Sequence, residues 1–229
     1  MELALMKKVF RIADIEPFEA LPSGHTAWLL TMVGNLSVVI FESKEEAEFP
    51  SFYHQEEEFI YVLRGHLEYD DGRVAQAGEA VFNLPNIKHA GKYNGQLICI
   101  RVFPEEGKSV LSNDLMREVM RKENVKMFYD ARIMSTRRLW AATESFSVVM
   151  IESQPGSTFQ SIKHPEKEIL YLIQGHLEYE DGRVVKDGEA VVNLPNMPHS
   201  VSRKGLRSTV SLEAKAPADP RILEILREQ

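Results

Sequence analysis

Cysteine, long apolar runs and surplus positive charge are all scarce in this sequence, and each scarcity excludes a class of protein. The single cysteine, Cys99, excludes an internal disulfide framework and favours a reducing compartment, so we expect a cytoplasmic protein. No apolar run approaches the roughly 20 residues of a membrane span, and the N-terminal MELALMKKVF lacks the architecture of a signal peptide. A formal net charge of −7 without a basic stripe argues against nucleic acid. We therefore expect neither a membrane nor nucleic acid as a partner.

What the sequence does contain is a long internal repeat. The stretch 54–89 reads HQEEEFIYVLRGHLEYDDGRVAQAGEAVFNLPNIKH, and 164–199 reads HPEKEILYLIQGHLEYEDGRVVKDGEAVVNLPNMPH. The two stretches align without a gap, and SVVIFES at 37–43 keeps the same offset against SVVMIES at 147–153. A repeat of this length is a duplicated domain, because solenoid units recur every 20–50 residues or so. Any site in one half is therefore expected twice.

The apolar segments of the repeat predict an all-β fold. They are short, rich in Val, Ile, Phe and Tyr, and interrupted by turn residues every 6–12 positions. Asp71-Gly72 and Asp181-Gly182 each separate two such segments, which predicts two hairpins. Between the halves, the apolar spacing of LSNDLMREVMRKEN predicts a helix over 111–124. Asp219 as N-cap and Pro220 at the first helical position predict a second helix at the C-terminus.

Each repeat also carries two histidines and a glutamate whose pattern indicates a metal site. His54 and Glu58 are four residues apart beside a strand-like segment, and even spacing on a strand places both side chains on one face. Ile60 and Val62 share that face, which is therefore the interior, where a glutamate is costly unless it is paired or bound to a cation. His89 follows after two hairpins, as closure of a barrel around a central point requires. The second repeat supplies the same set as His164, Glu168 and His199.

Two imidazoles and one carboxylate suit a divalent transition metal, with Fe, Mn, Ni, Zn and Co as the candidates. The alternative is that these side chains only line a polar barrel interior, hydrogen-bonded to each other and to water. Tyr69 and Tyr179, which are repeated as well, are predicted to be packing residues, and Cys99 is predicted to be a buried strand residue.

The same positions resemble the motifs of the cupin family. The first motif, G-x5-H-x-H-x3–4-E-x6-G, is matched in spacing by two sets of residues: Gly156, Ile162, His164, Glu168 and Gly175, and Glu46, Phe52, His54, Glu58 and Gly65. The second motif, G-x5-P-x-G-x2-H-x3-N, matches in spacing from Gly78 to His89 and from Gly188 to His199. Its final asparagine is replaced by Tyr93 and Arg203. The resemblance covers 37–103 and 147–213, so the chain is similar to a bicupin.

This resemblance implies two tandem jelly-roll β-barrels with a short helical linker and a C-terminal helix. The expected boundaries are 1–104 for the first barrel, 105–128 for the linker and 129–229 for the second barrel with its helix. Cupins of this kind often pair through barrel faces, which implies an intramolecular pseudo-dimer of the two halves, with a homodimer as a further expectation.

The resemblance also implies a ligand set of three histidines and one glutamate, and this sequence departs from it. Phe52 and Ile162 stand where the first histidine of each motif is expected. Glu56 and Glu166, two residues before the ligand glutamates, are expected to share their strand face. We hypothesise that they act as a fourth ligand or as the general base.

The leading functional interpretation is a metal-dependent enzyme that acts on a small organic metabolite. From the family resemblance, dioxygenation is the first candidate reaction, and isomerisation or hydrolysis is the second. The alternative is a non-catalytic bicupin that binds or senses a small sugar-like or carboxylate-like ligand, and the loss of one histidine from each set favours it. A storage role is disfavoured because metal-type residues persist in both halves. The fold alone does not choose among these functions.

Overall fold

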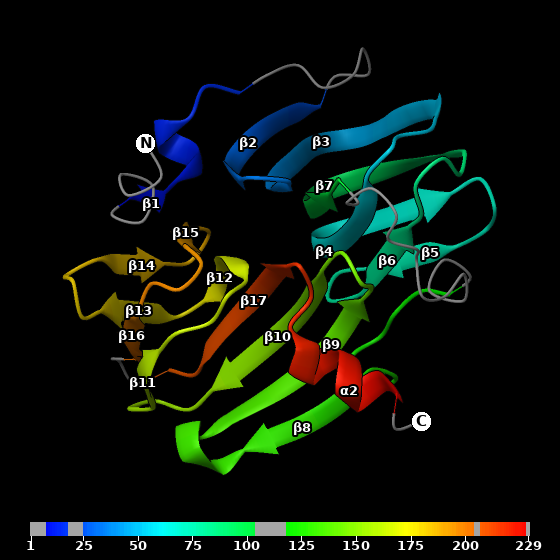
Figure 1. Cartoon of the computed structure of the whole chain (residues 1–229). Coiled ribbons are helices and arrows are strands. Elements are labelled where there is room, and N and C mark those ends of the chain that lie inside the picture. The colour runs from blue at the N-terminus through cyan, green and yellow to red at the C-terminus, as the bar shows by residue number, and fades with distance from the viewer. Residues whose placement is uncertain (1–7, 18–24, 104–117, 204–206, 228–229) are drawn as a thin grey trace. The chain divides into compact units, whose positions relative to one another are not determined.

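The structure is a computed structural model that describes residues 8–17, 25–103, 118–203 and 207–227, without the side chains of 50, 52, 132, 160–162 and 225–227 (Figure 1). The chain forms two compact units, which are described one at a time. The N-terminal unit is Ile15–Val125 with Thr143–Ser145, and the C-terminal unit is Met1–Asp14 with Lys126–Ala142 and Phe146–Gln229. None of the helices in the described ranges reaches the length and apolarity that a membrane-spanning helix needs.

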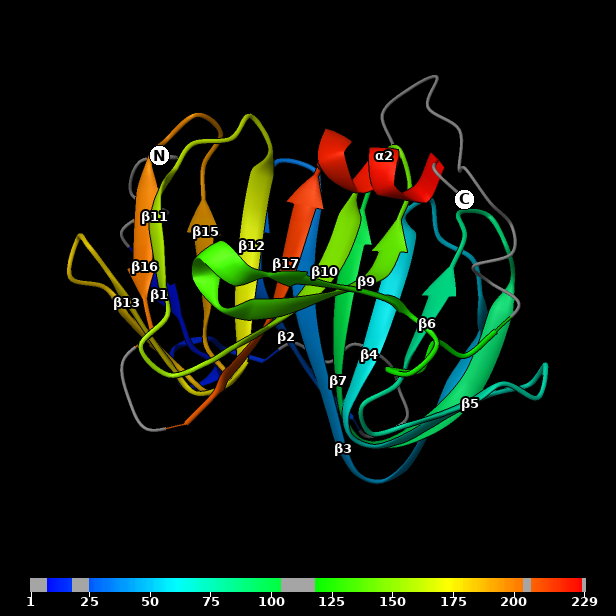
Figure 2. The same cartoon turned by 90° about the horizontal axis from the view of Figure 1, so that it is seen from below.

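The N-terminal unit is built from one antiparallel sheet in the order β2-β3-β7-β4-β5, with β6 paired to β4. Its strands are β2 (Thr26–Val33), β3 (Leu36–Phe52), β4 (Glu57–Tyr69), β5 (Val74–Gln76), β6 (Ala80–Asn83) and β7 (His89–Val102). The long strands β3, β7 and β4 run side by side, as Figure 2 shows. The predicted hairpin at Asp71-Gly72 is confirmed, because β4 pairs with β5 and Gly72 has a φ of 90°. The unit thus has the all-β character that the sequence predicts.

One hydrophobic core cluster of this unit lies on the face of the sheet that Glu58 shares. Fully buried side chains from β4 and β6 meet those of β7, among them Val62, Leu67, Val81 and Cys99. The prediction that Cys99 is a buried strand residue is confirmed. Alternation along β4 and β7 therefore aims one set of side chains inward, and Glu58 shares the inward-facing parity of Ile60 and Val62.

The C-terminal unit contains a seven-stranded and a four-stranded sheet. The larger sheet has the order β1-β15-β12-β17-β10-β9-β8 and the smaller one β11-β16-β13-β14. The larger sheet consists of β1 (Val9–Phe10), β8 (Lys126–Asp130), β9 (Ser135–Ala142), β10 (Ser147–Ser153), β12 (Lys167–Gln174), β15 (Ala190–Asn193) and β17 (Thr209–Ala216). The smaller sheet consists of β11 (Thr158–Ile162), β13 (His176–Tyr179), β14 (Val184–Lys186) and β16 (His199–Ser202). The 3-10 helices η1 (Ile12–Asp14) and η3 (Ala131–Ile133) and the C-terminal helix α2 (Pro220–Arg227) complete this unit.

The first described strand of the chain belongs to this C-terminal sheet. Val9 of β1 is paired with Val191 of β15, and Arg11 donates from Nε to Glu189 at 2.6 Å. The expected boundaries placed residues 1–104 in a single domain, whereas this pairing assigns β1 to the other unit. A two-residue strand carries too little sequence pattern to reveal which sheet it joins.

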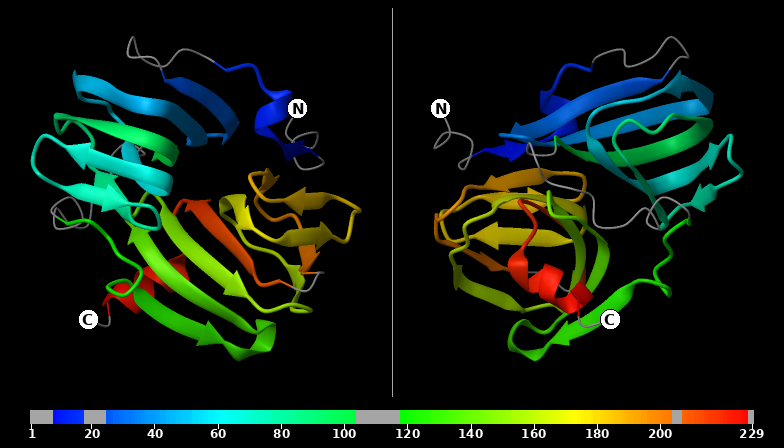
Figure 3. Two further views of the ribbon diagram at one scale, coloured as in Figure 1. Left: turned by 180° about the vertical axis from the view of Figure 1, so that it is seen from behind. Right: turned by 45° about the vertical axis from the view of Figure 1, so that its right-hand side comes forward.

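The C-terminal helix α2 (Pro220–Arg227) is present as predicted (Figure 3). Asp219 caps it, since its Oδ1 accepts the backbone N–H of Arg221 at 3.0 Å. The helix contacts β9, and Ile222 is buried in the core of the unit with Leu223 packed against it. Ile222 and Leu223 therefore lie on the side of the helix that faces the core.

The helix predicted over 111–124 is not confirmed. Residues 111–117 lie outside the described residues, and 118–124 form turns and a β-bridge instead of helix. The N–H of Met120 donates to Ala80 at 2.8 Å, and the N–H of Ala80 donates to Met120 at 3.0 Å. The apolar Val119 packs against the core of the N-terminal unit. Tertiary pairing to a sheet edge thus overrides the helical periodicity in the described part of this segment.

Candidate metal centre

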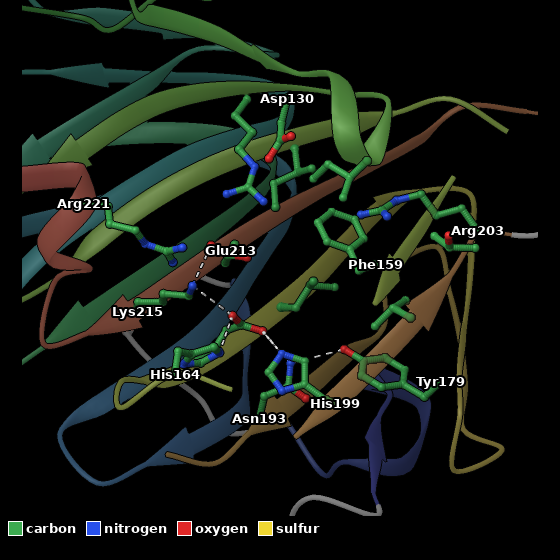
Figure 4. A pocket seen from close by; sticks show the side chains of 17 residues that line it. Asp130, Phe159, His164, Tyr179, Asn193, His199, Arg203, Glu213, Lys215 and Arg221 are labelled. Carbon is green, nitrogen blue, oxygen red and sulfur yellow. Dashed lines mark hydrogen bonds and ion pairs between the residues drawn. The ribbon is translucent and has the colours of Figure 1, made fainter. Parts of the chain in front are cut away.

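The C-terminal unit brings His164, Glu168 and His199 together in one buried cluster (Figure 4). His164 lies in the bend before β12, Glu168 is on β12, and His199 is the first residue of β16. The Nε2 atom of His164 lies 3.2 Å from Glu168 Oε2, and that of His199 lies 3.8 Å from Glu168 Oε1. The potential ligand atoms all lie within 4.8 Å of one another. The sequence-predicted set is therefore assembled in space.

The N-terminal unit assembles its own copy from His54, Glu58 and His89. Both Nε2 atoms face the same carboxylate oxygen, Glu58 Oε2, at 3.4 Å for His54 and 3.6 Å for His89. The two imidazole rings lie 5.0 Å apart at an interplanar angle of 78°, against 5.1 Å and 84° in the C-terminal unit. The duplicated sequence thus gives two centres of nearly the same geometry.

Backbone carbonyls fix the tautomer of all four histidines. His164 Nδ1 lies 3.0 Å from the carbonyl of Glu166, and His199 Nδ1 lies 3.2 Å from that of Met197. His54 and His89 make the same contacts at 2.8 and 3.0 Å. A carbonyl oxygen only accepts, so each Nδ1 carries the proton. In the neutral imidazole each Nε2 then directs a lone pair at the glutamate, which is the form that binds a metal.

A lone pair and a carboxylate that face each other are two acceptors, and they need a cation between them. A proton on Nε2 can be that cation. Burial on its own would lower the pKa of His164, but the hydrogen bond and charge of Glu168 outweigh burial and raise the pKa, which favours the protonated ring. A divalent metal can play the same part with three ligand atoms supplied by the protein. The donor set and its tautomers therefore fit a metal ion.

In the N-terminal centre, a guanidinium already compensates the glutamate. Arg101 on β7 donates to Glu58 Oε1 from Nε at 2.8 Å, and its Nη2 lies 2.7 Å from the same oxygen. Cys99 Sγ donates to Oε1 at 3.1 Å, and Asn83 Nδ2 donates to Oε2 at 2.7 Å. Burial would raise the pKa of Glu58, but Arg101 and the two histidines hold it well below its ordinary value. This carboxylate is ionised and fully engaged.

In the C-terminal centre, a lysine occupies the equivalent place at a longer distance. The strand register pairs Glu168 with Lys215 as it pairs Glu58 with Arg101. Lys215 Nζ lies 3.5 Å from Glu168 Oε2, and it is shared with Glu213 at 3.4 Å and Asp219 at 3.6 Å. Burial opposes the charge on Lys215, but these three carboxylates outweigh it and raise the pKa. Glu168 is therefore less tightly held than Glu58.

Sequence reasoning missed these two cations because the repeat loses its register before the last strand. By the constant offset of the repeat, the equivalent of Arg101 is Ser211. By the strand pairings, its equivalent is Lys215. A gapless comparison therefore does not align the two basic residues. The signal that could have found them is a basic residue near the end of the last strand of each repeat, SLEAKA in one copy and ICIRVF in the other.

A repeated asparagine also orients each glutamate. Asn193 Nδ2 donates to Glu168 Oε1 at 2.5 Å and to the hydroxyl of Tyr179 at 3.4 Å. In the other unit, Asn83 donates to the hydroxyl of Tyr69 at 2.7 Å in addition to Glu58. Tyr69 and Tyr179 lie in the two cores as predicted, and they also anchor this network. The asparagine recurs in both copies of NLPN, which is the signal that could have found it.

The hypothesis for Glu56 and Glu166 rests on a strand face that these residues do not share. β4 begins at Glu57 and β12 at Lys167, so both glutamates lie in the preceding bends. Glu166 Oε2 lies 3.2 Å from His164 Nδ1, and Glu56 Oε2 lies 3.8 Å from His54 Nδ1. The expectation that Glu56 and Glu166 share the strand face of Glu58 and Glu168 is therefore wrong. The carboxylates sit at the Nδ1 edge of each ring, on the side away from Nε2, and their role as ligand or base stays a prediction.

Comparisons with known proteins agree with this architecture. Residues 7–104 match the family model described as the ChrR cupin-like domain, and no curated protein matches the sequence. The crystal structure of AerE from Microcystis aeruginosa aligns with a TM-score of 0.73 at 15% identity, over 90% of this chain and 98% of that one. The formate complex of Lactobacillus farciminis oxalate decarboxylase gives 0.70 at 14%, over 91% and 86%. The fold is a cupin fold.

A third solved structure has the same fold. Oxalate decarboxylase of Bacillus subtilis, studied for its Mn(II) centres, aligns with a TM-score of 0.67 at 15% identity, over 91% of this chain and 76% of that one. At such identities the likeness shows the fold alone. The two His/Glu clusters found among the described residues therefore stand on their own geometry as candidate metal sites in this fold.

The positions of the missing cupin histidines lie beside the centres. Phe52 at the end of β3 is paired with His89, and Ile162 at the end of β11 is paired with His199. The motif alignment thus places both residues next to the ligand set. Neither residue type can bind a metal, so each centre has two histidines and one glutamate.

The C-terminal centre lies in the wall of a cavity. This cavity of about 520 Å³ reaches from His164, Glu168 and His199 to Phe159 and Arg203. Leu170 and Ile60 are equivalent positions of the repeat. Leu170 is paired with Glu213, and Ile60 is paired with Cys99, so Glu213 takes the place that Cys99 has in the N-terminal unit. The C-terminal unit therefore has a polar side chain at this place, whereas Cys99 packs into the apolar core of the N-terminal unit.

Proposed function

We propose that the protein is a bicupin whose C-terminal unit binds a divalent transition metal and uses it on a small organic metabolite. The observation that carries this proposal is the set of tautomers at His164 and His199: backbone carbonyls hold both Nδ1 protons, and both Nε2 atoms face Glu168. Two lone pairs and a buried carboxylate then converge on one point. That convergence is costly without a cation and ordinary for a metal site.

The C-terminal unit is the working half for two reasons. Glu58 in the N-terminal unit gives one oxygen to Arg101 and Cys99 and shares the other with Asn83, so the guanidinium takes the place of a metal charge. Glu168 faces an ammonium that is shared among three carboxylates, and a cavity large enough for a small metabolite opens beside it.

When bound, the metal would supply a Lewis acid and stabilise negative charge on a substrate oxygen. His164, Glu168 and His199 would hold it, and Asn193 would keep the carboxylate in position through the bond to Oε1. Lys215 adds a fixed positive charge to the same buried wall and favours an anionic state of the substrate. Dioxygenation is the first candidate reaction, and isomerisation or hydrolysis is the second.

The competing function is a non-catalytic module that binds a small ligand. The observation in its favour is the pairing of each glutamate with a built-in cation, Arg101 or Lys215, in centres that lack one cupin histidine. In that case the charges already balance without a metal. A homodimer with a small-molecule ligand is part of either proposal.

The two functions separate when the metal is removed. The full-length protein is treated with a chelator, reloaded with Mn(II) or Fe(II), and incubated with mixed small metabolites while oxygen uptake and product masses are recorded. The enzyme proposal expects turnover that disappears on chelation, returns on reloading, and is absent in His164→Ala but present in the matched variant His54→Ala. Turnover that survives chelation would contradict it. Ligand affinity that is unchanged by chelation, without turnover, would support the binding module.

A further inference from the structure

Arg203 is a buried arginine at the wall of the C-terminal cavity. Its backbone is fixed beside β11, because its N–H donates to Ser157 at 2.9 Å and its carbonyl accepts from Gly156 at 2.9 Å. Its guanidinium stacks on the Phe159 ring at 3.9 Å from the centroid, and the residue is only 3% exposed. Figure 4 shows Arg203 and Phe159 at the end of the cavity away from His164 and Lys215.

The guanidinium of Arg203 has two nitrogen atoms without an acceptor. Within the part of the chain that the structure describes, its Nε and Nη1 atoms are buried and have no hydrogen-bond partner. A buried charge without a partner is expensive. Burial is the main reason that the pKa of Arg203 falls to about 9; the charges of Tyr179 and Glu213 oppose the fall without cancelling it, and the neighbouring Arg137 adds to it. Arg183, which is also buried in this unit, differs at Nε, which donates to both oxygens of Asp181 at 3.0 and 2.8 Å.

A second arginine lines the same end of the cavity. The guanidinium of Arg137 on β9 lies 5.9 Å from the centroid of the Phe159 ring, and its buried Nε has no hydrogen-bond partner among the described residues. Two guanidinium groups at one ring repel each other unless an anion lies between them. The other cations of the cavity are engaged, since Lys215 contacts three carboxylates and Arg221 Nη2 lies 2.6 Å from Asp219.

This arrangement is specific to one copy of the repeat. Tyr93 occupies the place of Arg203 in the N-terminal unit, at the constant offset of the repeat. Phe41 and Ile151 are equivalent positions of the repeat. Phe41 is paired with Ala27, whereas Ile151 is paired with Arg137, so Ala27 takes the place of Arg137 in the N-terminal unit. Both arginines therefore occur only in the copy of the repeat that contains this cavity.

We propose that the C-terminal cavity binds a small carboxylic acid, whose carboxylate accepts hydrogen bonds from Arg203 and Arg137 beside the Phe159 ring. The planar fork of a guanidinium matches a carboxylate in a bidentate fashion. The acidic groups Glu213 and Asp130 on the same walls favour a singly charged headgroup over a doubly charged phosphate. The rest of the molecule reaches toward His164, Glu168 and His199. This last step rests on the proposed function, whereas recognition of the carboxylate needs no metal.

The test measures binding to the full-length, chelator-treated protein by calorimetry, with acetate, pyruvate and benzoate as probes. Acetamide and benzamide are the neutral controls, and inorganic phosphate is the competing anion. At least one carboxylate is expected to bind and its amide not to bind. Arg203→Gln is expected to weaken binding by about 10- to 100-fold, as the loss of a charged hydrogen-bond pair implies. Arg203→Lys, which keeps the charge but not the fork, is expected to lie between. The matched variant Arg183→Gln is expected to bind as the unaltered protein does.

Thermal unfolding gives a second readout that a structural arginine would not show. Because Arg203 is unmatched in the free protein, Arg203→Gln is expected to keep or raise the unfolding midpoint, while Arg183→Gln lowers it. Failure of every carboxylate to bind, equal binding of acid and amide, or unchanged binding in Arg203→Gln would overturn the proposal. Arg203-dependent binding of phosphate alone would overturn the ligand class. A protein that binds carboxylates without a metal but never retains a metal would refute the proposed function and leave this inference standing.

Discussion

Arg101 reaches Glu58 across the ladder between β4 and β7, with Nη2 2.7 Å and Nε 2.8 Å from one carboxylate oxygen. The side chain of Glu58 is 1% exposed, so this contact balances a buried charge. The duplicated chain therefore handles the same buried glutamate in two ways, with a close guanidinium in one unit and a shared ammonium in the other.

Replacement of Arg101 by Met is expected to turn the N-terminal centre into a better metal site. Without the guanidinium, Glu58 Oε1 is free to act as a ligand and the repulsion of an incoming cation is removed. The buried carboxylate then lacks its partner, which lowers the stability of the metal-free protein by up to about 3 kcal/mol. Thermal unfolding with and without added Mn(II) should show a larger metal-induced rise in midpoint than in the unaltered protein. Arg64→Met, which removes a surface contact to Glu42, is the control, and an equal rise in both variants would refute the explanation.

Asn193→Ala is expected to weaken metal binding at the C-terminal centre by about 10- to 100-fold, as the loss of a residue that orients a ligand commonly does. The reason is that Asn193 holds Glu168 Oε1 and itself contacts Tyr179. Competition with a fluorescent chelator measures the affinity. The matched variant Asn83→Ala alters only the other unit and should leave this affinity unchanged. Equal losses in the two variants would show that the asparagines act through general stability.

Asp219→Asn is expected to lower stability at neutral pH in a way that disappears in acid. Burial would raise the pKa of Asp219, but Arg221 and Lys215 outweigh it and hold the pKa below the ordinary value of 3.8. A carboxyl with a lowered pKa stabilises the fold above 3.8 and loses this effect as the pH falls through the folded-state pKa.

Asparagine keeps the helix cap, so this variant tests the charge alone. Because Arg221 is largely exposed, the expected loss at pH 7 is only about 1 kcal/mol. Unfolding midpoints at pH 7 and pH 3 provide the measurement, with Glu224→Gln on the exposed side of α2 as the control. A difference of the same size at both pH values would mean that the ion pairs with Asp219 contribute nothing.

Gly175→Ala is expected to destabilise the C-terminal unit more than Gly182→Ala. Both glycines have a positive φ, +107° and +89°, so any side chain adds backbone strain of about 1–2 kcal/mol. Only Gly175 also lacks room, because a Cβ there would lie 2.8 Å from Thr209 Oγ1 and 3.0 Å from Thr209 Cα, whereas a Cβ at Gly182 meets nothing within 4 Å. Thermal unfolding compares the two variants. Equal midpoints would show that the strand at Thr209 yields to the added methyl group.

The sequence predicted the residues of the centre better than the roles around it. His54, Glu58 and His89 could be found because strand parity and the gapless repeat both point at them, and His164, Glu168 and His199 follow at the same offset. Asp219 and Pro220 predicted α2 because capping chemistry is local. Interactions that depend on neighbours in sequence, or on a pattern present twice, are within reach of sequence reasoning.

Interactions that depend on the register between strands distant in the sequence could not be predicted. Lys215 lies beyond the point where the repeat keeps its offset, and Arg203 differs both from the motif and from Tyr93 of the other copy. Only the pairing of β12 with β17 and the packing of Phe159 reveal what they contact. The helix expected at 118–124 failed for a similar reason, because Met120 pairs with Ala80, a partner that is distant in the sequence. Glu166 was misplaced by extending β12 too far toward the N-terminus.

The central claim is that the C-terminal centre holds a metal. Elemental analysis of protein purified without an affinity metal, for the unaltered chain and for the His164→Ala and His54→Ala variants, tests it most directly. We expect stoichiometric Mn, Fe, Ni, Zn or Co that is lost in His164→Ala and retained in His54→Ala. No stoichiometric metal even after reconstitution, or a metal that His164→Ala retains, would contradict it, and the four histidines would then be polar lining of a ligand-binding cupin.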